Sequence, residues 1–186
     1  MHSRVCCMSS NTRENTQRLF FALWPNAEVR AALEEASLSL LGKRVKRIPA
    51  SNLHITLAFA GSVTVRVRQC LEAAAGNLTL APFDLILDHS GYWQRPRIAW
   101  LGPTHTPPAL WSLVGGLRTV FETCGLPLET RPYQPHVTLA RKVSRLASDV
   151  PVTPLPWSIR SFSLVESVNT PHGVSYQPLV TWTLEG

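Results

Sequence analysis

The feature that most constrains this chain is a four-residue pattern, His-x-Thr-Leu, which occurs at residues 54–57 and again at residues 136–139. Random placement of the chain's own residues predicts only about 0.06 copies of the pattern. Both copies lie in alternating apolar stretches that are typical of half-buried strands. Because successive side chains of a strand point to opposite faces, the histidine and the threonine of each copy are predicted to share one face.

The first copy shows this alternation over several residues. It predicts that His54 and Thr56 lie on one face of a strand and that Ile55, Leu57 and Phe59 lie on the other. A polar face on a single strand is ordinarily explained by contact with water. Its repetition in the second copy favours a functional role.

The residues that precede each copy form a similar series. The apolar periodicity predicts a strand, a helix and a histidine strand twice, at 18–24, 26–41 and 54–60 and again at 98–102, 107–124 and 136–140. Such an internal repeat predicts two pseudo-symmetric lobes whose histidine faces meet across a central cleft. Strands and helices mixed in this order indicate an α+β fold, with antiparallel or mixed sheets and outer helices.

Local signals predict the remaining elements. We expect an edge strand at 45–49, a helix at 63–75, one strand at 83–93, a proline-rich connection at 150–157, and strands near 160–168 and 176–184. The polar residues 1–17 are predicted to be a disordered extension, so that the folded domain spans 18–186.

The composition is that of an ordinary globular domain. With 186 residues, of which 45% are apolar and 16% charged, the chain can bury a large core without a disulfide or a structural metal. No apolar run reaches the ~18 residues of a membrane helix, and the N-terminus lacks the apolar core of a signal peptide. Cys6, Cys7, Cys70 and Cys124 show no metal-binding spacing, which indicates reduced thiols and a cytoplasmic location. We expect a monomer that does not contact a membrane.

The formal net charge of +6 favours a polyanionic partner such as a nucleic acid. The basic residues gather in four groups: Lys43, Arg44, Lys46 and Arg47; Arg66 and Arg68; Arg95 and Arg97; and Arg141, Lys142 and Arg145. Any one group can be explained as solvated surface, but three of the four lie close in sequence to a His-x-Thr pair.

Two His-x-Thr faces that meet would supply an acid and a base. The unperturbed pKa of histidine, near 6.5, allows one imidazole to be neutral while the other is protonated. This pair suits in-line displacement at a phosphodiester, and the threonine hydroxyls can donate to the phosphate oxygens. No carboxylate cluster accompanies the histidines, so the sequence predicts neither a metal nor another cofactor.

The competing chemical interpretation is a zinc site, which needs a third protein ligand. His89, His105 and His172 are available, but they lie in loop-like segments without a fixed spacing to the motifs.

Six segments spread over residues 18–184 carry a family resemblance: RLFFALWP, NLHITLAFAG, WLG, YQPHVTLAR, SFSLVES and GVSYQPL. They resemble the bacterial RNA 2′,3′-cyclic phosphodiesterases, also called 2′–5′ RNA ligases, of the two-histidine phosphoesterase superfamily. The resemblance implies a bilobal α+β fold and metal-free hydrolysis of an RNA-terminal 2′,3′-cyclic phosphate, with release of O3′ and retention of a 2′-phosphate. In some members it also implies reversible 2′–5′ joining of RNA ends.

The resemblance assigns roles to individual residues. It implies that His54 is the proton donor, that His136 is the proton acceptor, and that Thr56, Thr138 and Arg141 bind the phosphate. Strict alternation places Arg141 on the face opposite His136. Its side chain therefore reaches the phosphate only if the strand ends, or contains a bulge, before it.

The chain departs from the family pattern at two positions. An aromatic residue is common where this chain has Gln134, and leucine is frequent where it has Ala60. Neither position is expected to touch the chemistry, but the departure at Gln134 bears on how the wall of the cleft is built.

The two histidines differ in their charged neighbours. Arg141 and Lys142 follow His136, and a nearby cation disfavours the protonated imidazole. Uncharged residues follow His54. We therefore expect His136 to be neutral and His54 to carry the proton.

Two other functions stay open at this point. An RNA-end-binding module would keep the cleft but would need no acid and base, and a related enzyme could act on a small cyclic nucleotide or an ADP-ribose cyclic phosphate. Trp93 and Phe59 are candidates for stacking a terminal base, although core packing is the simpler explanation for both.

Overall fold

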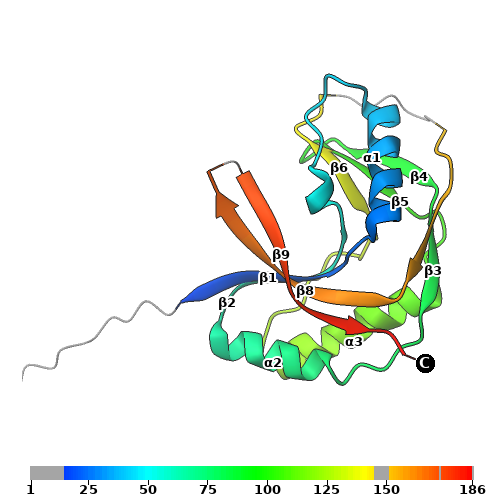
Figure 1. Cartoon of the computed structure of the whole chain (residues 1–186). Helices are drawn as coiled ribbons and strands as arrows, with labels where there is room; N and C mark the ends of the chain where they lie inside the picture. The colour runs from blue at the N-terminus through cyan, green and yellow to red at the C-terminus, as the bar shows by residue number, and fades with distance from the viewer. Residues whose placement is uncertain (1–14, 145–150, 172, 186) are drawn as a thin grey trace, which may run out of the picture.

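The computed structural model describes residues 15–144, 151–171 and 173–185, which form the α-helices, short 3-10 helix and strands of Figure 1. In chain order the elements are β1 (Thr16–Leu23), α1 (Ala27–Leu41), η1 (Ala50–Asn52), β2 (Ile55–Thr64), α2 (Val65–Ala75), β3 (Phe83–Leu87), β4 (His89–Trp93), β5 (Ile98–Gly102), α3 (Pro108–Thr123), β6 (Val137–Arg141), β7 (Leu155–Ile159), β8 (Ser161–Thr170) and β9 (Gly173–Thr183). The mixture confirms the predicted α+β class.

The two histidine strands lie in the middle of a seven-stranded sheet, whose order is β4-β5-β6-β2-β1-β8-β9. β2 and β6 pair antiparallel through Ile55 and Val137. Each of these residues directly follows its histidine, so the two motifs meet at the centre of the sheet. This arrangement confirms the predicted meeting of the two halves.

The helix of each strand–helix–strand unit packs against the strands of the other unit (Figure 1). α1 follows β1 in the chain, but its Leu41 packs against Ala99 of β5 and Ala140 of β6. α3 follows β5, but its Phe121 packs against Phe21 of β1, with ring centroids 6.1 Å apart. The exchange matches the predicted strand–helix–strand repeat.

β1 is buried on both faces, which explains its continuous apolar run. Leu19, Phe21 and Leu23 belong to the main core, whereas Phe20 and Ala22 belong to a smaller apolar cluster on the other face. The smaller cluster lies under one of the two histidines, as described below.

The helix boundaries follow local signals. The Asn26 side chain accepts a hydrogen bond from the Val29 amide at 2.9 Å and caps α1. Gly42, at φ 70°, ends the same helix in the left-handed region that glycine adopts without strain. Both positions agree with the prediction.

Two strand predictions are wrong. The single strand expected at 83–93 breaks at Asp88, and β3 and β4 join different sheets. At the break, the Asp88 amide donates to the Gly102 carbonyl and the Asp88 carboxylate accepts from the Thr104 amide. The strand expected at 45–49 is reduced to one bridge, between Arg47 and Ala140.

The proline-rich connection is also shorter than predicted. Residues from Leu155 onward form β7, which pairs with β3 in a separate two-stranded sheet. Leu155, Trp157 and Ile159 are buried in alternation with exposed residues, and Pro156 occupies one of the exposed positions. Edge strands of this kind tolerate proline.

β1 begins at Thr16, two residues before the strand predicted from residue 18. Residues 1–14, on which the predicted extension mostly falls, lie outside the described residues. None of the helices in the described ranges has the length and apolar character of a membrane span.

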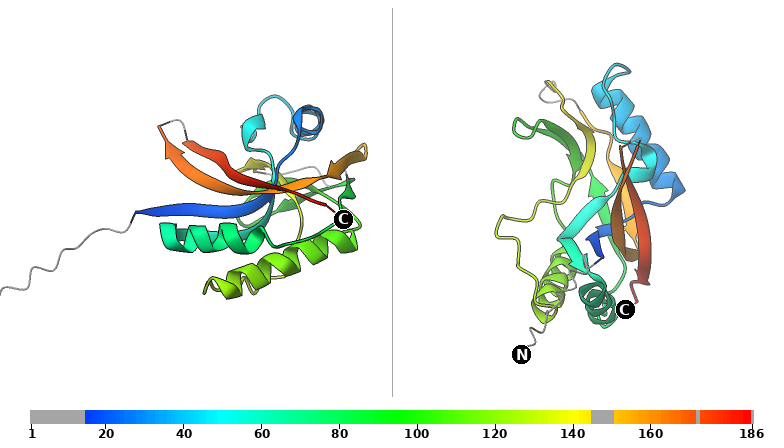
Figure 2. Two further views of the ribbon diagram at one scale, coloured as in Figure 1. Left: turned by 60° about the horizontal axis from the view of Figure 1, so that its bottom comes forward. Right: turned by 90° about the vertical axis from the view of Figure 1, so that its left-hand side faces the viewer.

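The prediction of reduced thiols is wrong for two of the four cysteines. Cys70 of α2 and Cys124 at the end of α3 form a disulfide, with Cα atoms 5.8 Å apart. The two helices lie side by side in both views of Figure 2. The sequence hides this pairing because 54 positions separate the cysteines. Cys6 and Cys7 lie outside the described residues.

Candidate active site

A cavity of about 440 Å³ opens where the two motifs meet, and we call it the histidine cavity. His54, Thr56, His136, Thr138 and Arg141 all line it. The structure therefore brings together all five residues that the sequence singled out.

The two imidazoles are held by the same local contact. His54 Nδ1 lies 2.7 Å from the Asn52 carbonyl oxygen, and His136 Nδ1 lies 2.8 Å from the Gln134 carbonyl oxygen. A carbonyl oxygen only accepts, so both Nδ1 atoms carry hydrogen and donate. In a neutral ring Nε2 is then the unprotonated nitrogen that can take up a proton. Because the Gln134 backbone makes this contact, the departure from the family pattern at that position does not affect it.

His54 lies on the smaller apolar cluster, to which Phe20 and Ala22 of β1 belong. Its ring stacks on Trp24, with centroids 5.5 Å apart and planes inclined by 14°. Phe20 and Tyr176 lie against it at centroid distances of 5.0 Å each. Its Nε2 lies 3.0 Å from the Thr56 hydroxyl oxygen, which donates to the neutral ring.

Burial among these rings governs the charge of His54. It lowers the pKa of His54 from 6.5 to about 4, because the imidazolium loses its hydration. The hydrogen bond to Asn52 opposes this effect, and the charges of His136 and Arg141 add to it. In the free protein His54 is therefore neutral near pH 7.

His136 rests on a different aromatic support. The Trp93 ring meets it edge-on at a centroid distance of 4.6 Å, and Trp93 in turn packs on Trp100 at 5.3 Å. Trp100 lies across Gly91, where a Cβ atom would come within 2.1 Å of the indole. The glycine thus makes room for the ring that supports Trp93 and, through it, His136.

The expected difference in charge between the two histidines is wrong. Burial lowers the pKa of His136 as well, with a further contribution from Arg141. Arg141 acts on both rings, since they share one cavity, so it does not single out His136. Both imidazoles are neutral before an anion binds.

Arg141 reaches the cavity because β6 contains a bulge. Thr138 pairs with Trp100 and Ala140 pairs with Ala99, which leaves Leu139 as an extra residue on β6. The extra residue shifts the alternation by one position and returns Arg141 to the side of Thr138. The sequence required a bulge or the end of the strand before Arg141, and the bulge at Leu139 fulfils this requirement.

A similar irregularity in β2 overturns the prediction for Phe59. Phe21 pairs with Ala58 but Ala22 pairs with Thr56, so Leu57 is the extra residue. Phe59 consequently lines the histidine cavity instead of sharing the core face with Leu57. It is 50% exposed, so core packing does not explain it.

Several lining residues were missed by the sequence reasoning. They come from β1, β8 and β9, and they are Arg18, Phe20, Ser167, Asn169, Val174 and Tyr176. Arg18 lies 4.7 Å above the Phe59 ring, where cation and ring attract. The only signal in the sequence was that Arg18 and Phe20 lie two positions apart on one predicted strand and therefore share a face. Using this signal required knowing that β1 pairs with β2.

The four basic groups of the sequence contribute less than expected. Among their described members only Arg141 lines the histidine cavity. Arg68 bonds to Glu72 on α2 instead. Arg145 lies outside the described residues.

The remaining histidines do not build the alternative zinc site in the described part of the chain. His89 belongs to β4 rather than a loop, and its ring packs on Trp100 at 5.5 Å. Neither His89 nor His105 lines the histidine cavity, and no group of three or more His, Cys, Asp or Glu side chains gathers within residues 15–144, 151–171 and 173–185. His172 lies outside these ranges.

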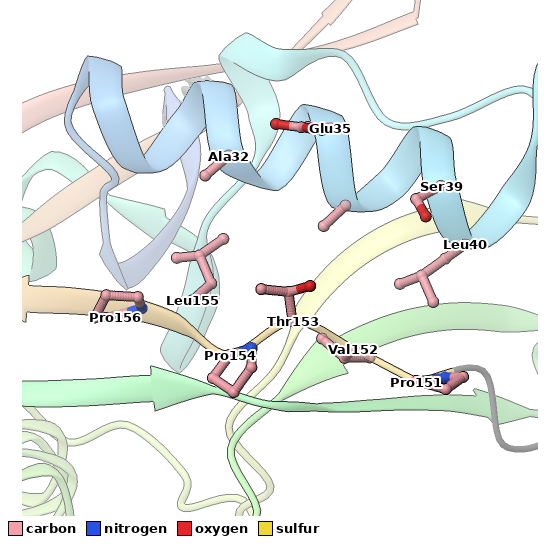
Figure 3. Close-up of a pocket in the computed structure, with 11 residues that line it drawn as sticks. Ala32, Glu35, Ser39, Leu40, Pro151, Val152, Thr153, Pro154, Leu155 and Pro156 are labelled. Atoms are coloured by element: carbon pink, nitrogen blue, oxygen red, sulfur yellow. The ribbon is translucent and has the colours of Figure 1, made fainter.

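Two further cavities bear on the assignment. One of about 460 Å³, which we call the lateral cavity, adjoins the histidine cavity and shares Thr56, Phe59 and His136 with it. Another of about 330 Å³ lies between α1 and segment 151–156 (Figure 3). Its one ionisable lining residue is Glu35, so it lacks the pair of acid and base that the histidine cavity contains.

Comparison with known proteins agrees with this geometry. The model of the 2′-5′ RNA ligase superfamily matches residues 25–171, a range that contains both motifs. The chain belongs to this superfamily. It is 35% identical over 171 residues to the RNA 2′,3′-cyclic phosphodiesterase of Escherichia coli (strain K12), and the aligned residues cover 90% of this chain and 97% of the relative. It is 34% identical over 182 residues to the protein of the same name from Thermus thermophilus, with 91% of each chain covered.

A solved structure from the superfamily shows the same fold. The crystal structure of E. coli LigT complexed with 3′-AMP superposes with a TM-score of 0.84 at 32% identity, over 92% of this chain and 100% of that one. The family resemblance and the bilobal α+β architecture inferred from the sequence are confirmed.

Proposed function

We propose that the protein hydrolyses an RNA-terminal 2′,3′-cyclic phosphate to a 2′-phosphate, with His54 as proton donor and His136 as proton acceptor. The observation that carries this proposal is the shared geometry of the two rings, each bonded through Nδ1 to a backbone carbonyl two residues earlier, in one cavity. That geometry leaves Nε2 of each ring for chemistry. The superfamily membership and the names of the relatives support the choice of substrate.

The proposed step is an in-line displacement. A water molecule attacks phosphorus and gives its proton to Nε2 of neutral His136, the P–O3′ bond breaks, and Nε2 of protonated His54 gives its proton to O3′. Thr56, Thr138 and Arg141 hold the phosphate oxygens by hydrogen bonds and charge. Every group in this step is a protein side chain, so the proposal includes no metal and no other cofactor.

The negative charge of the bound phosphate allows His54 to take up a proton from solvent. In the free protein the pKa of His54 is about 4, but a phosphate anion beside the ring favours the imidazolium. Once Nε2 is protonated it no longer accepts from Thr56. The Thr56 hydroxyl is then released to donate to the phosphate.

The decisive experiment measures turnover of an oligoribonucleotide that ends in a 2′,3′-cyclic phosphate, in the presence of EDTA. We expect hydrolysis that EDTA does not slow, and a 2′-phosphate product in phosphorus NMR. A 3′-phosphate or a mixture would show that the donor and acceptor roles are assigned wrongly. Binding without turnover would instead indicate an RNA-end-binding module.

A second candidate substrate is a small cyclic nucleotide or an ADP-ribose cyclic phosphate. Its support is that only two cationic side chains, Arg18 and Arg141, line the histidine cavity among the described residues. Salt dependence separates the two candidates, because RNA binding releases counterions and weakens steeply as salt rises. A Kd that is independent of salt, together with faster turnover of a mononucleoside cyclic phosphate, would favour the small substrate. If an alcohol replaced water in the same step, the product would be a 2′–5′ linkage between RNA ends.

A further inference from the structure

Tyr133 connects the two His-x-Thr motifs. Its hydroxyl donates to the backbone carbonyl of Thr56 at 3.2 Å, although 77 positions separate the two residues. The next residue, Gln134, supplies the carbonyl that accepts from His136 Nδ1 at 2.8 Å. Thr56 in turn bonds through its hydroxyl to His54 Nε2 at 3.0 Å. A path of three hydrogen bonds and the covalent segments between them therefore joins the two imidazoles, and the Tyr133 hydroxyl makes the middle bond.

Strand pairing holds the two motifs together at one position. Within the part of the chain that the structure describes, β2 and β6 pair only through Ile55 and Val137. Farther along β6, the Leu139 carbonyl accepts from the Ile48 amide at 2.7 Å and not from β2. The bond from Tyr133 thus adds a second tie close to the point where the two strands separate.

The segment that carries Tyr133 has little conformational freedom. Pro132 and Pro135 flank Tyr133 and Gln134. A proline ring fixes its own φ and restricts the backbone of the residue before it, which here is Gln134. A position imposed on the Tyr133 hydroxyl is therefore transmitted to the Gln134 carbonyl, and through it to His136.

The Tyr133 ring is held before a substrate binds. Trp111 of α3 meets it edge-on at a centroid distance of 5.8 Å, and the ring packs against the main core. Burial raises the pKa of the hydroxyl, which therefore keeps its proton at neutral pH and serves as a donor. Tyr133 lines the lateral cavity but not the histidine cavity, so it does not touch the reacting atoms.

In-line displacement is sensitive to the separation of the two rings. In the proposed step His136 must reach the entering oxygen and His54 the leaving oxygen, and these oxygens lie on opposite sides of phosphorus. A misplacement of about 1 Å can lower a rate by about 10². A contact that fixes the separation of the rings can therefore contribute to the rate without touching the substrate.

We propose that Tyr133 is a positioning residue that sets the separation of His54 and His136 through its bond to the Thr56 carbonyl. The role rests on the proposed function, because it requires both rings to act in one step. It makes the hydroxyl important for turnover and much less important for substrate binding or folding.

The test removes the hydroxyl and keeps the ring. In Tyr133→Phe we expect kcat for the cyclic-phosphate oligoribonucleotide to fall about three- to tenfold, the effect of one hydrogen bond, while KM and the urea midpoint change little. The matched control is Tyr92→Phe. The Tyr92 hydroxyl also donates to a backbone carbonyl, that of Val143 at 2.9 Å, but Tyr92 lines neither the histidine cavity nor the lateral cavity. This control should leave kcat unchanged.

A double-variant cycle distinguishes positioning from a general structural effect. In a His136→Ala background the two rings no longer act together. Tyr133→Phe should therefore lower the residual rate much less than it lowers the rate of the unmodified protein. An equal loss in both backgrounds would overturn the positioning role, because the hydroxyl would then act independently of His136.

The remaining outcomes separate this inference from the proposed function. Normal kcat in Tyr133→Phe, together with turnover by the unmodified protein, would overturn the positioning role and leave the proposed function intact. A rise in KM without a loss in kcat would also overturn it, since the hydroxyl would then serve binding. Absence of turnover in the unmodified protein would refute the proposed function and the positioning role with it.

Discussion

Asn52 donates a hydrogen bond from its side-chain amide to the backbone carbonyl of Val174, at 2.8 Å. Its own backbone carbonyl accepts from His54 Nδ1 at 2.7 Å. One residue therefore connects a candidate catalytic ring to the hairpin of β8 and β9, on which Val174 and Tyr176 line the histidine cavity. The hairpin wall and the ring are both hydrogen-bonded to Asn52.

Replacing Asn52 with alanine removes the amide but keeps the carbonyl that holds His54. We expect KM for the cyclic-phosphate oligonucleotide to rise about two- to tenfold, the effect of one hydrogen bond, while kcat changes less. Asn77→Ala, at an exposed position after α2, should change neither. A larger loss in kcat than in KM would mean that the side chain acts on His54 and not on the hairpin.

The two histidines are expected to act in one step. His54→Gln and His136→Ala should each lower turnover by about 10² to 10⁴, the usual effect of losing a general acid or base, and the double variant should lose less than the two effects combined. Glutamine at 54 limits the loss of packing against Trp24 and Phe20. His105→Ala, at an exposed loop position outside the histidine cavity, is the control. Near-normal turnover in either single variant is incompatible with the mechanism.

The pH dependence follows from the lowered pKa values. The pKa of His54 is about 4 and that of His136 is also lowered, and the profile of kcat/KM reports the free enzyme. The active form, with His54 protonated and His136 neutral, becomes more populated as pH falls toward these pKa values. We expect kcat/KM to rise by up to about tenfold per unit as pH is lowered from 8 to 6.

Arg141→Gln tests the direction in which the pH profile moves. Arg141 lowers the pKa of both histidines, so its removal should move the profile to higher pH, in addition to weakening phosphate binding. A profile that is flat between pH 6 and 8, or that moves to lower pH in Arg141→Gln, would contradict the assigned charges.

Gly91→Ala should disturb His136 from a distance. The added Cβ would lie 2.1 Å from the Trp100 ring, and Trp100 supports the Trp93 ring that contacts His136. We expect a loss of about 1–3 kcal/mol in the free energy of unfolding from overpacking, and a lower kcat. The matched control is Gly115→Ala on α3, where nothing lies within 4 Å of the new Cβ and alanine favours the helix. The explanation fails if both variants behave alike.

The disulfide between Cys70 and Cys124 should stabilise the fold. It closes a loop with a sequence separation of 54, so Cys70→Ser is expected to lower the free energy of unfolding by about 2–4 kcal/mol in urea titrations. Adding dithiothreitol to the unmodified protein should reproduce this loss, and adding it to Cys70→Ser should have no further effect. Equal stability of the two proteins under oxidising conditions would show that the bond does not stabilise the fold.

Local patterns predicted the parts of the molecule that local forces decide. The helix from Ala27 to Leu41 begins at an asparagine cap and ends at a glycine, and the His-x-Thr spacing placed each histidine with its threonine. The strand–helix–strand repeat also predicted that the motifs meet. In each case the signal lies within a few residues of the feature.

Pairing and burial decided what the sequence did not predict. Phe59 changed faces because of its register with β1, and Cys70 found its partner because two helices pack together. The charge of His54 was predicted from residues that follow it in the chain. It is governed instead by Trp24, Phe20 and Tyr176, which are its neighbours in space only.

The bulge at Leu139 makes the count of residues in β6, and not only their identity, a condition for binding an anion. His136 and Arg141 are an odd number of positions apart, so regular alternation would place their side chains on opposite faces. They share a face because β6 holds one residue more than its partner strand β5. A lineage that lost the extra residue would regain regular alternation and a better-paired sheet, but its guanidinium would turn away from the phosphate. Selection on this strand should therefore tolerate many substitutions and reject single-residue insertions and deletions.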